Sequence, residues 1–247
     1  MDAILEQPLI QGSGTSEHDW LLSVELLQTA TLPLDALVPE GARMVVVAPH
    51  PDDEVLGTGG LMSIAAAHHR QVMIVAVTDG EASHPAHDPQ VVARIRTSER
   101  MRALWELNIR SHVEHRLGLP DGAVALHTEL LTESLAEVLR DDDVLFCPWS
   151  RDGHPDHEAT ASAVKSLAKR RELSLYQVPI WGWHWCTPES FPWDKAVRFP
   201  IDSDTLKRKA RALEAFRSQI DDDLDQPILT QSTLDHFRRP FELFFRP

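Results

Sequence analysis

The sequence contains few cysteines and no long apolar segment. Its two cysteines, Cys147 and Cys186, lie far apart without a C-x-x-C spacing, so we expect two buried, reduced thiols. No apolar run approaches the ~20 residues that a membrane-spanning helix needs. The first residues lack a basic segment followed by an apolar core, and we therefore expect no signal peptide. These absences favour a cytoplasmic protein without an integral membrane segment.

Positive charge is also scarce. The 38 Asp and Glu residues outnumber the 24 Lys and Arg residues, and the formal net charge is −14. Nucleic acids and anionic membranes bind mainly through basic surfaces, so this balance disfavours both as partners. A small molecule is the expected ligand. The sequence leaves open whether the chain forms a homo-oligomer.

The pattern of apolar residues predicts an α/β protein. The length of 247 residues, 43% of them hydrophobic, suits one large α/β domain or two small ones. Strands are expected at 43–48, 71–78, 113–117, 144–148, 173–179 and 196–199, and helices at 57–69, 90–107, 128–139, 156–169 and 203–217. Thr128 and Ser203 are the candidate N-caps of two of these helices. The alternation predicts a three-layer fold with a mainly parallel sheet.

The two ends of the chain are less regular. We expect residues 1–40 to form an N-terminal extension that packs on a single domain of residues 41–247. Within the extension, the apolar spacing of residues 18–30 does not decide between a short helix and a strand. A docked terminal helix is expected at 230–245, and the basic residues of the helix at 203–217 are expected to face solvent.

One stretch, Val45 to Glu54, suggests where the chemistry lies. A buried apolar run ends there in His50, Asp52, Asp53 and Glu54, where a strand gives way to the turn before a helix. In open α/β sheets, sites form outside the carboxyl ends of the strands. Carboxylates crowded at such a place repel one another unless a cation or protons compensate. The stretch therefore indicates a metal.

Two further polar loops follow predicted strands. One carries Asp79 and Glu81, and the other carries His154, Asp156 and His157. Parallel strands bring such loops to the same edge of the sheet. Two histidines and one carboxylate, with an open position for water, suit a hydrolytic zinc site. Zinc lowers the pKa of its water towards ~7 and polarises a carbonyl group.

Hydrolysis needs two further groups. A second carboxylate must take the proton of the water, and a protonated imidazole can steady the oxyanion and protonate the leaving group. On the residues alone, Asp52 and Glu54 are both candidate bases, and His154 is the candidate acid.

Two motifs together resemble a known family. Pro49-His50-Pro51-Asp52-Asp53-Glu54, followed later by Gly153-His154-Pro155-Asp156-His157, resembles the PIG-L/LmbE-like zinc-dependent N-acetylglucosaminyl deacetylases. The resemblance extends over residues 43–220 and includes Thr78-Asp79-Gly80-Glu81, the Arg96-x-x-Glu99 pair and Leu117-Gly118-Leu119-Pro120-Asp121-Gly122. It implies a Rossmann-like fold and a hydrolase that removes an N-acetyl or N-acyl group from an amino-sugar conjugate by attack of zinc-bound water on the amide.

The resemblance also implies a role for each motif residue. His50, Asp53 and His157 are the implied metal ligands, and Asp52 is the implied general base. His154 would stabilise the tetrahedral intermediate and protonate the departing amine. Asp156 would hold His154 protonated and oriented. The implied contacts to sugar hydroxyls come from Glu81, Arg96 and Asp121.

Several alternatives remain open. One is a larger thiol- or glycopeptide-type conjugate as the substrate, and another is a non-catalytic metal- or sugar-binding module on the same fold. A two-metal phosphoesterase is a weaker alternative, because no second ligand set is visible. Fe²⁺ is an alternative to Zn²⁺, since two imidazoles and a carboxylate suit both ions. The Trp181–Trp185 segment suits either a substrate pocket or packing.

Overall fold

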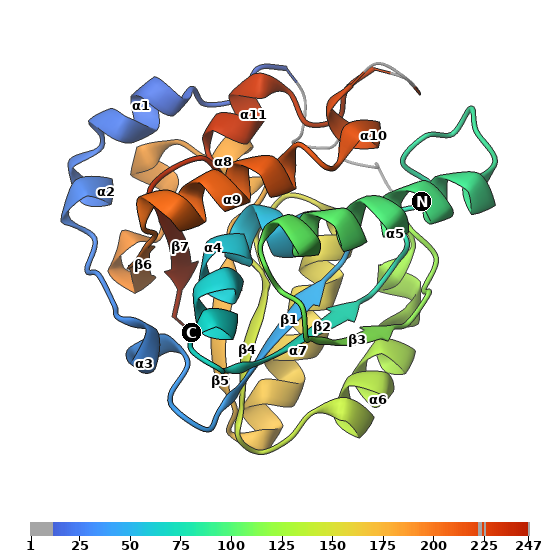
Figure 1. Ribbon diagram of the computed structural model, residues 1–247, viewed down its shortest axis with the longest axis horizontal. Coiled ribbons are helices and arrows are strands. Elements are labelled where there is room, and N and C mark those ends of the chain that lie inside the picture. Colours follow the sequence, from blue (N-terminus) through green and yellow to red (C-terminus); the bar gives the residue numbers. More distant parts are fainter. Residues whose placement is uncertain (1–11, 222–223, 225, 247) are drawn as a thin grey trace, which may run out of the picture.

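The computed structural model describes residues 12–221, 224 and 226–246. The strands of this described part form one seven-stranded sheet (Figure 1). They are β1 (Arg43–Ala48), β2 (Gln71–Ala76), β3 (Val113–Arg116), β4 (Asp143–Pro148), β5 (Ser174–Val178), β6 (Ala196–Pro200) and β7 (Phe241–Phe245). β1, with its run of three valines, is buried along its whole length, as expected of a central parallel strand.

The strand order across the sheet is β3-β2-β1-β4-β5-β7-β6. The first five strands in this order are parallel neighbours, whereas β7 is antiparallel to both β5 and β6. The chain proceeds outward from β1 in one direction and from β4 in the other. The carboxyl ends of β1 and β4 therefore flank a topological switch point, where a crevice forms in such sheets.

Helices cover both faces of the sheet (Figure 1). Alternate side chains of β1 separate two cores: Met44 and Val46 join one, and Val45 and Val47 join the other. The first core is closed by α4 (Asp53–Ala67), α5 (Pro89–Glu106) and α9 (Ser203–Leu213), and the second by α6 (Thr128–Val138) and α7 (Pro155–Arg171). This arrangement confirms the predicted three-layer, Rossmann-like fold.

Shorter helices complete the described part of the chain. They are α1 (Glu17–Leu22), α2 (Val24–Gln28), α3 (Leu34–Leu37), α8 (Gly182–Trp185), α10 (Arg217–Ile220) and α11 (Gln231–Asp235). The segment that suited either a helix or a strand is thus two short helices. They are separated at Ser23, whose hydroxyl accepts the Leu26 N–H and so caps α2. No described helix is long and apolar enough to cross a membrane.

One predicted helix start and two predicted N-caps were wrong. α4 begins at Asp53 rather than Gly57, because the chain turns sharply at Asp52 and an acidic first turn is favourable at a helix N-terminus. A 3₁₀ turn (Val124–His127) leads directly into α6, so Thr128 is not its N-cap. Asp202, not Ser203, caps α9, because its carboxylate accepts two N–H groups of the first turn.

The predicted terminal helix at 230–245 was also wrong. Only Gln231–Asp235 is helical, as α11, and the aromatic run that follows Pro240 forms β7. Proline cannot continue a helix, and phenylalanine is favoured in strands. β7 lies between β5 and β6 and contributes buried aromatic side chains to the first core.

A buried carboxylate connects β7 to the middle of α4. Glu242 Oε1 accepts the Gly60 N–H at 2.7 Å, and Glu242 Oε2 accepts the Leu61 N–H at 2.8 Å. Lys209 Nζ donates to Glu242 at 2.6 Å and to the carbonyl of Leu56 at 2.8 Å. Lys209 is therefore buried, unlike the solvent-facing side chain expected for this basic helix.

The described residues of the N-terminal segment lie against the C-terminal third of the chain. Trp20 is fully buried, makes an edge contact with Trp183 at a centroid distance of 4.9 Å, and donates from Nε1 to the Trp183 carbonyl. Glu17 accepts hydrogen bonds from Arg239 Nε at 2.8 Å and from His236 Nδ1 at 2.7 Å. The division of the chain near residue 40 stays a prediction.

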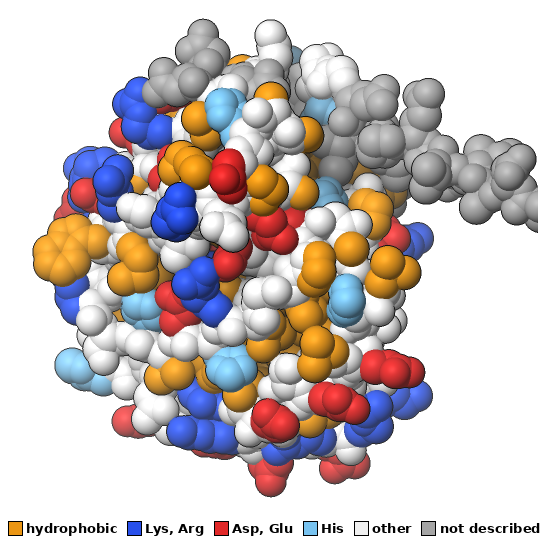
Figure 2. Space-filling view, turned by 90° about the vertical axis from the view of Figure 1, so that its right-hand side faces the viewer, with side chains coloured by type: hydrophobic (Ala, Val, Ile, Leu, Met, Phe, Trp, Pro, Cys, Tyr) orange, Lys and Arg blue, Asp and Glu red, His pale blue; other side chains and the backbone are white. Residues whose placement is uncertain are grey.

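The surface view gives the distribution of charge on one face of the molecule. Lys and Arg side chains are interspersed there with Asp and Glu side chains (Figure 2). The described residues on this face form no continuous basic strip of the kind that tracks a phosphate backbone.

Candidate metal centre and active site

Two loops at the carboxyl edge of the sheet bring three ligand atoms together. His50 follows β1, Asp53 opens α4, and His157 lies in the first turn of α7. His50 Nδ1, Asp53 Oδ2 and His157 Nε2 lie 3.2–3.3 Å from one another. A tetrahedral zinc site with bonds of about 2.0–2.1 Å has ligand–ligand edges of about 3.3 Å. The three atoms therefore fit one face of such a site.

Carboxylates hold the outer side of both imidazole rings. His157 Nδ1 lies 2.8 Å from Asp152 Oδ2, and His50 Nε2 lies 3.1 Å from Asp121 Oδ1. An ionised carboxylate only accepts, so each ring carries a proton on its outer nitrogen. In the neutral rings, the inner nitrogens turn their lone pairs toward Asp53. Two lone pairs and a carboxylate oxygen in contact are the donor set of a zinc or iron site.

The electrostatics of this centre favour positive charge. Burial disfavours the imidazolium form of His157, but Asp53 and Asp152 outweigh burial and raise its pKa to about 9. Burial also opposes a charged His50, yet hydrogen bonds to carboxylates, that of Asp121 foremost, raise its pKa well above the ordinary value. The negative charge that favours protons on these rings also favours a metal cation.

A second possible ligand group shares His50 with the first. It consists of His50, His154 and Asp156, with ligand atoms within 4.8 Å of one another. The Asp156 carboxylate, however, accepts the Gly122 N–H at 2.7 Å and the Val124 N–H at 3.1 Å. These bonds occupy Asp156 in positioning a loop, so the geometry favours the first group.

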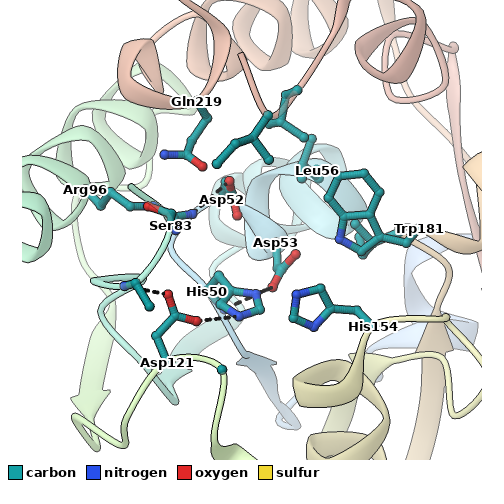
Figure 3. Close-up of a pocket in the computed structure, with 15 residues that line it drawn as sticks. His50, Asp52, Asp53, Leu56, Ser83, Arg96, Asp121, His154, Trp181 and Gln219 are labelled. Atoms are coloured by element: carbon teal, nitrogen blue, oxygen red, sulfur yellow. Dashed lines mark hydrogen bonds and ion pairs between the residues drawn. The ribbon is translucent and has the colours of Figure 1, made fainter. Parts of the chain in front are cut away.

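A cavity of about 270 Å³ opens above the centre (Figure 3). Its floor carries the side chains closest to the ligand triangle, and its walls differ in polarity. The floor residues are His50, Asp52, Asp53 and His154; the polar wall includes Ser83, Arg96, Asp121 and Gln219; the apolar wall includes Leu56, Ile180, Trp181, Ile228 and Leu229. The cavity can thus hold a molecule with one polar and one apolar side beside the metal centre.

Asp52 occupies the floor in an unusual backbone conformation. Its φ of 144° and ψ of −31° lie where residues with a Cβ are rarely found. Its carboxylate lies 3.1 Å from Arg96 Nη2. Burial is the main influence on this carboxylate, and it raises the pKa of Asp52 to about 7 although Arg96 opposes the shift. A carboxylate with this pKa can take up a proton near neutral pH.

His154 faces the cavity from the start of α7. Its Nδ1 accepts the main-chain N–H of Asp156 at 3.2 Å, so a neutral ring carries its proton on Nε2. Burial, with His157 and His50 nearby, lowers the pKa of His154 to about 3. The Asp156 carboxylate accepts N–H groups of the 122–124 loop, and its charge favours a protonated His154. The expected support of His154 by Asp156 stays a prediction.

The three residues expected to contact sugar hydroxyls differ in position. Arg96 and Asp121 line the cavity, whereas Glu81 is not among its lining residues. Glu81 accepts the Asp121 main-chain N–H at 2.9 Å and so holds the loop that carries Asp121. Arg96 donates to Asp52 and to the carbonyls of Pro51 and Gly80. Much of its hydrogen-bonding capacity is therefore used within the protein.

Two other acids from the sequence lie away from the cavity. Glu54 is fully buried behind Asp52, and its Oε2 accepts the Asp52 N–H at 3.3 Å. Burial raises the pKa of Glu54 to about 7. Asp79 forms two hydrogen bonds with Arg116 at the end of β3. Of the two candidate bases, only Asp52 lines the cavity.

The tryptophan-rich segment divides between the two expected environments. Trp181 lines the cavity, whereas Trp183 is buried in the first core. Trp185 Nε1 donates to the Asp152 carbonyl at 2.8 Å. The segment thus contributes one aromatic side chain to the cavity wall.

Two functional candidates were not recognised in the sequence. Asp152 is completely buried, bonds His157 and accepts three main-chain N–H groups of residues 180–182. Its position two residues before His154 was the available signal. Gln219 lies far from the motifs, and nothing in its local sequence distinguishes it.

The model of the PIG-L family, described as GlcNAc-PI de-N-acetylase, matches residues 45–168. The chain belongs to this family. The PIG-L match includes both histidine motifs and ends before the C-terminal part that supplies Gln219, Ile228 and Leu229 to the cavity.

Two curated relatives share 27–30% sequence identity with the chain. The chain is 30% identical over 140 residues to a probable N-acetyl-alpha-D-glucosaminyl L-malate deacetylase 2 of Bacillus subtilis, covering 53% of this chain and 62% of the relative. It is 27% identical over 201 residues to a 1D-myo-inositol 2-acetamido-2-deoxy-alpha-D-glucopyranoside deacetylase of Kineococcus radiotolerans. This match covers 62% of this chain and 55% of the relative. The chain thus spans less than two thirds of either relative's length.

A solved structure is similar over most of the chain. A conserved protein of Thermus thermophilus superposes with a TM-score of 0.55 at 26% identity, covering 72% of this chain and 80% of that protein. This similarity agrees with the α/β architecture described above.

Proposed function

We propose that the protein is a metal-dependent hydrolase that removes an N-acetyl or other N-acyl group from an amino-sugar conjugate, with Zn²⁺ as the metal and Fe²⁺ as the alternative. The observation that carries the proposal is the triangle of His50, Asp53 and His157 ligand atoms directly beside Asp52 on the floor of a cavity. The two relatives, each named as a deacetylase of an acetylated glucosamine conjugate, support the substrate class.

The three ligand residues would hold the ion, and their outer carboxylates would keep both imidazoles in the binding tautomer. A divalent ion bound there lowers the pKa of a water molecule and polarises the carbonyl of an amide. Asp152 and Asp121 supply the outer hydrogen bonds. The protein thus provides three ligands and leaves space on the cavity side for substrate.

Asp52 would act as the general base. It is the floor carboxylate not engaged with either imidazole, and its pKa of about 7 suits proton transfer near neutral pH. Arg96 fixes the direction of this carboxylate. After taking the water proton, Asp52 is the group able to deliver it to the departing nitrogen.

His154 would stabilise the oxyanion of the tetrahedral intermediate. Its Nδ1 already accepts the Asp156 N–H, so the neutral ring offers Nε2–H as a donor toward the cavity. To act as the acid that protonates the amine, His154 would need a second proton at Nδ1, where the Asp156 N–H points. We therefore assign amine protonation to Asp52.

The backbone at Asp52 favours an enzyme over a binding module. Strained conformations persist where function requires them, and binding alone does not need a carboxylate in this position.

The test is a deacylation assay on purified protein loaded with one Zn²⁺ or Fe²⁺ per chain. N-acetylglucosaminyl L-malate and methyl N-acetyl-α-D-glucosaminide are the substrates, with released amine and acetate both quantified. We expect equal amounts of the two products, dependence on metal, and loss of turnover in Asp52→Asn. Stoichiometric metal binding without amine release from any N-acyl amino sugar would overturn the proposal.

A further inference from the structure

The side chain of Gln219 enters the cavity from α10, opposite the metal centre. It is buried, with 1% of its surface exposed, although it lines the cavity. In Figure 3 its carboxamide oxygen points toward Asp52, and its nitrogen points away toward α5. Gln219 lies outside the residues that match the PIG-L family model, so the motifs assign it no role.

A chain of hydrogen bonds determines which end of the carboxamide faces the cavity. The Glu99 carboxylate accepts the Ser218 N–H at 2.8 Å and the Ser218 hydroxyl at 2.6 Å. Because the hydroxyl donates to Glu99, its oxygen accepts from its other neighbour, Gln219 Nε2, at 2.9 Å. The nitrogen is therefore held at Ser218, and Gln219 Oε1 is directed into the cavity.

The main chain of Gln219 is fixed as well. Its carbonyl accepts the N–H groups of Ile228 at 3.0 Å and Leu229 at 2.8 Å. These two residues form part of the apolar wall next to the carboxamide. Gln219 thus supplies a hydrogen-bond acceptor to the cavity and holds the adjoining apolar surface of Ile228 and Leu229 in place. All three residues belong to the same C-terminal segment.

Among the described residues, the side-chain hydrogen bond of Gln219 is made by Nε2, and Oε1 faces the cavity, where a ligand can donate to it. We propose that Gln219 is a specificity-determining residue whose Oε1 accepts a hydrogen bond from a hydroxyl group of the amino sugar, with Ile228 and Leu229 covering the adjacent apolar face of the same ligand. This inference rests on the proposed function and extends it to a residue outside the metal centre. Glu99 and Ser218 are its positioning residues.

The test compares methyl N-acetyl-α-D-glucosaminide with monodeoxy analogues that each lack one free hydroxyl. With the metal-loaded wild type, removal of the bonded hydroxyl should lower kcat/KM about fivefold, the effect of one net hydrogen bond. Gln219→Met has a similar shape but no acceptor. Its kcat/KM on the parent substrate should be about fivefold below that of the wild type, and removal of the bonded hydroxyl should cause no further decrease. Gln90→Met, at an exposed position outside the cavity lining, is the matched control.

Binding provides a second readout. Calorimetric titration of methyl α-D-glucosaminide and its deoxy analogues should show the same pattern of affinities without turnover. Ser218→Ala releases the carboxamide from its hydrogen bond while leaving Gln219 in place. It should reduce the wild-type preference for the bonded hydroxyl, and it covers the case in which Gln219→Met does not fold, as judged by thermal melting.

The outcomes separate this inference from the proposed function. The inference is overturned if the wild type is active or binds the sugars, but Gln219→Met and Ser218→Ala show the same ratios of kcat/KM or affinity between the parent sugar and each deoxy analogue as the wild type. That result leaves the proposed function standing. Absence of both turnover and binding in the wild type overturns the proposed function and this inference with it.

Discussion

Asp152 accepts a hydrogen bond from His157 Nδ1 at 2.8 Å in a site where both side chains are completely buried. The same carboxylate accepts the N–H groups of Ile180 and Trp181, two residues of the cavity wall. One side chain therefore orients a candidate metal ligand and holds the wall beside it. A change at Asp152 should affect both.

Replacing Asp152 with Asn should weaken metal binding about 10- to 100-fold, as expected when the outer partner of a ligand histidine is lost. Each oxygen of the Asp152 carboxylate accepts two N–H groups. In either orientation of the introduced amide, its NH₂ group would therefore face two other N–H donors. Competition with a chromophoric chelator measures the affinity. Asp194→Asn, at an exposed position, is the control. Wild-type affinity in Asp152→Asn would refute this role.

Replacing Asp52 with Asn should leave the metal bound and reduce kcat by about 10²- to 10⁴-fold, because the general base is lost. Zinc content by elemental analysis and steady-state kinetics give the two readouts. Glu54→Gln tests the other carboxylate considered as base. It should have the smaller effect, since Glu54 does not line the cavity. Full activity in Asp52→Asn would exclude this residue as the base.

The backbone at Asp52 gives a prediction about stability. At a φ of 144°, a residue with a Cβ is strained by about 1–3 kcal/mol, and glycine is not. Asp52→Gly should therefore be more stable than Asp52→Ala by about 0.5–2 kcal/mol. The lower figure allows for the greater conformational entropy of glycine in the unfolded chain. Neither variant has the carboxylate, so the difference isolates the backbone. Urea unfolding measures it, and Asp52→Ala as the more stable variant would contradict the prediction.

The contact between Glu17 and Arg239 predicts a dependence of stability on pH. Burial opposes the charged form of Glu17, but hydrogen bonds from Arg239 and His236 outweigh burial and lower its pKa. A lowered folded-state pKa stabilises the protein above the unfolded-state value of about 4.3, and this stability is lost as pH falls through the folded-state pKa.

Glu17→Gln should therefore lower the free energy of unfolding at pH 7 by about 1–2 kcal/mol, a value reduced for partial solvent exposure. The penalty should shrink near pH 4. Denaturant titrations at the two pH values measure the change, with the exposed Glu40→Gln as control. An equal penalty at both pH values would show that charge on Glu17 does not stabilise the fold.

Local sequence patterns predicted the parts of the fold that depend on local physics. β1 occupies the predicted residues, because a run of valines between a turn and two prolines leaves few alternatives. The start of α4 was missed by four residues, since the turn depends on the φ of Asp52, which no propensity describes. The Phe-rich C-terminus was assigned the wrong element because its position between β5 and β6 is decided by long-range pairing.

In the candidate site too, local motifs were predictable and long-range contacts were not. The sequence motifs predicted which residues gather at the carboxyl edge, because they sit on strand ends that a parallel sheet brings together. Asp152 and Gln219 act through hydrogen bonds to residues distant in sequence, so only the folded chain reveals them. The hydrogen bonds of the Asp156 carboxylate to the 122–124 loop were not predicted for the same reason, since that loop is distant in sequence.

The bonds from Glu242 to α4 determine an order of events during biosynthesis. Gly60 and the Glu242 that accepts its N–H are separated by 182 residues, so the helix that begins with Asp53 leaves the ribosome long before this partner. Until β7 has been translated, the N–H groups of Gly60 and Leu61 cannot form the hydrogen bonds seen in the folded protein, and Lys209 lacks its counter-ion. Final packing of α4 consequently waits until β7 has been synthesised.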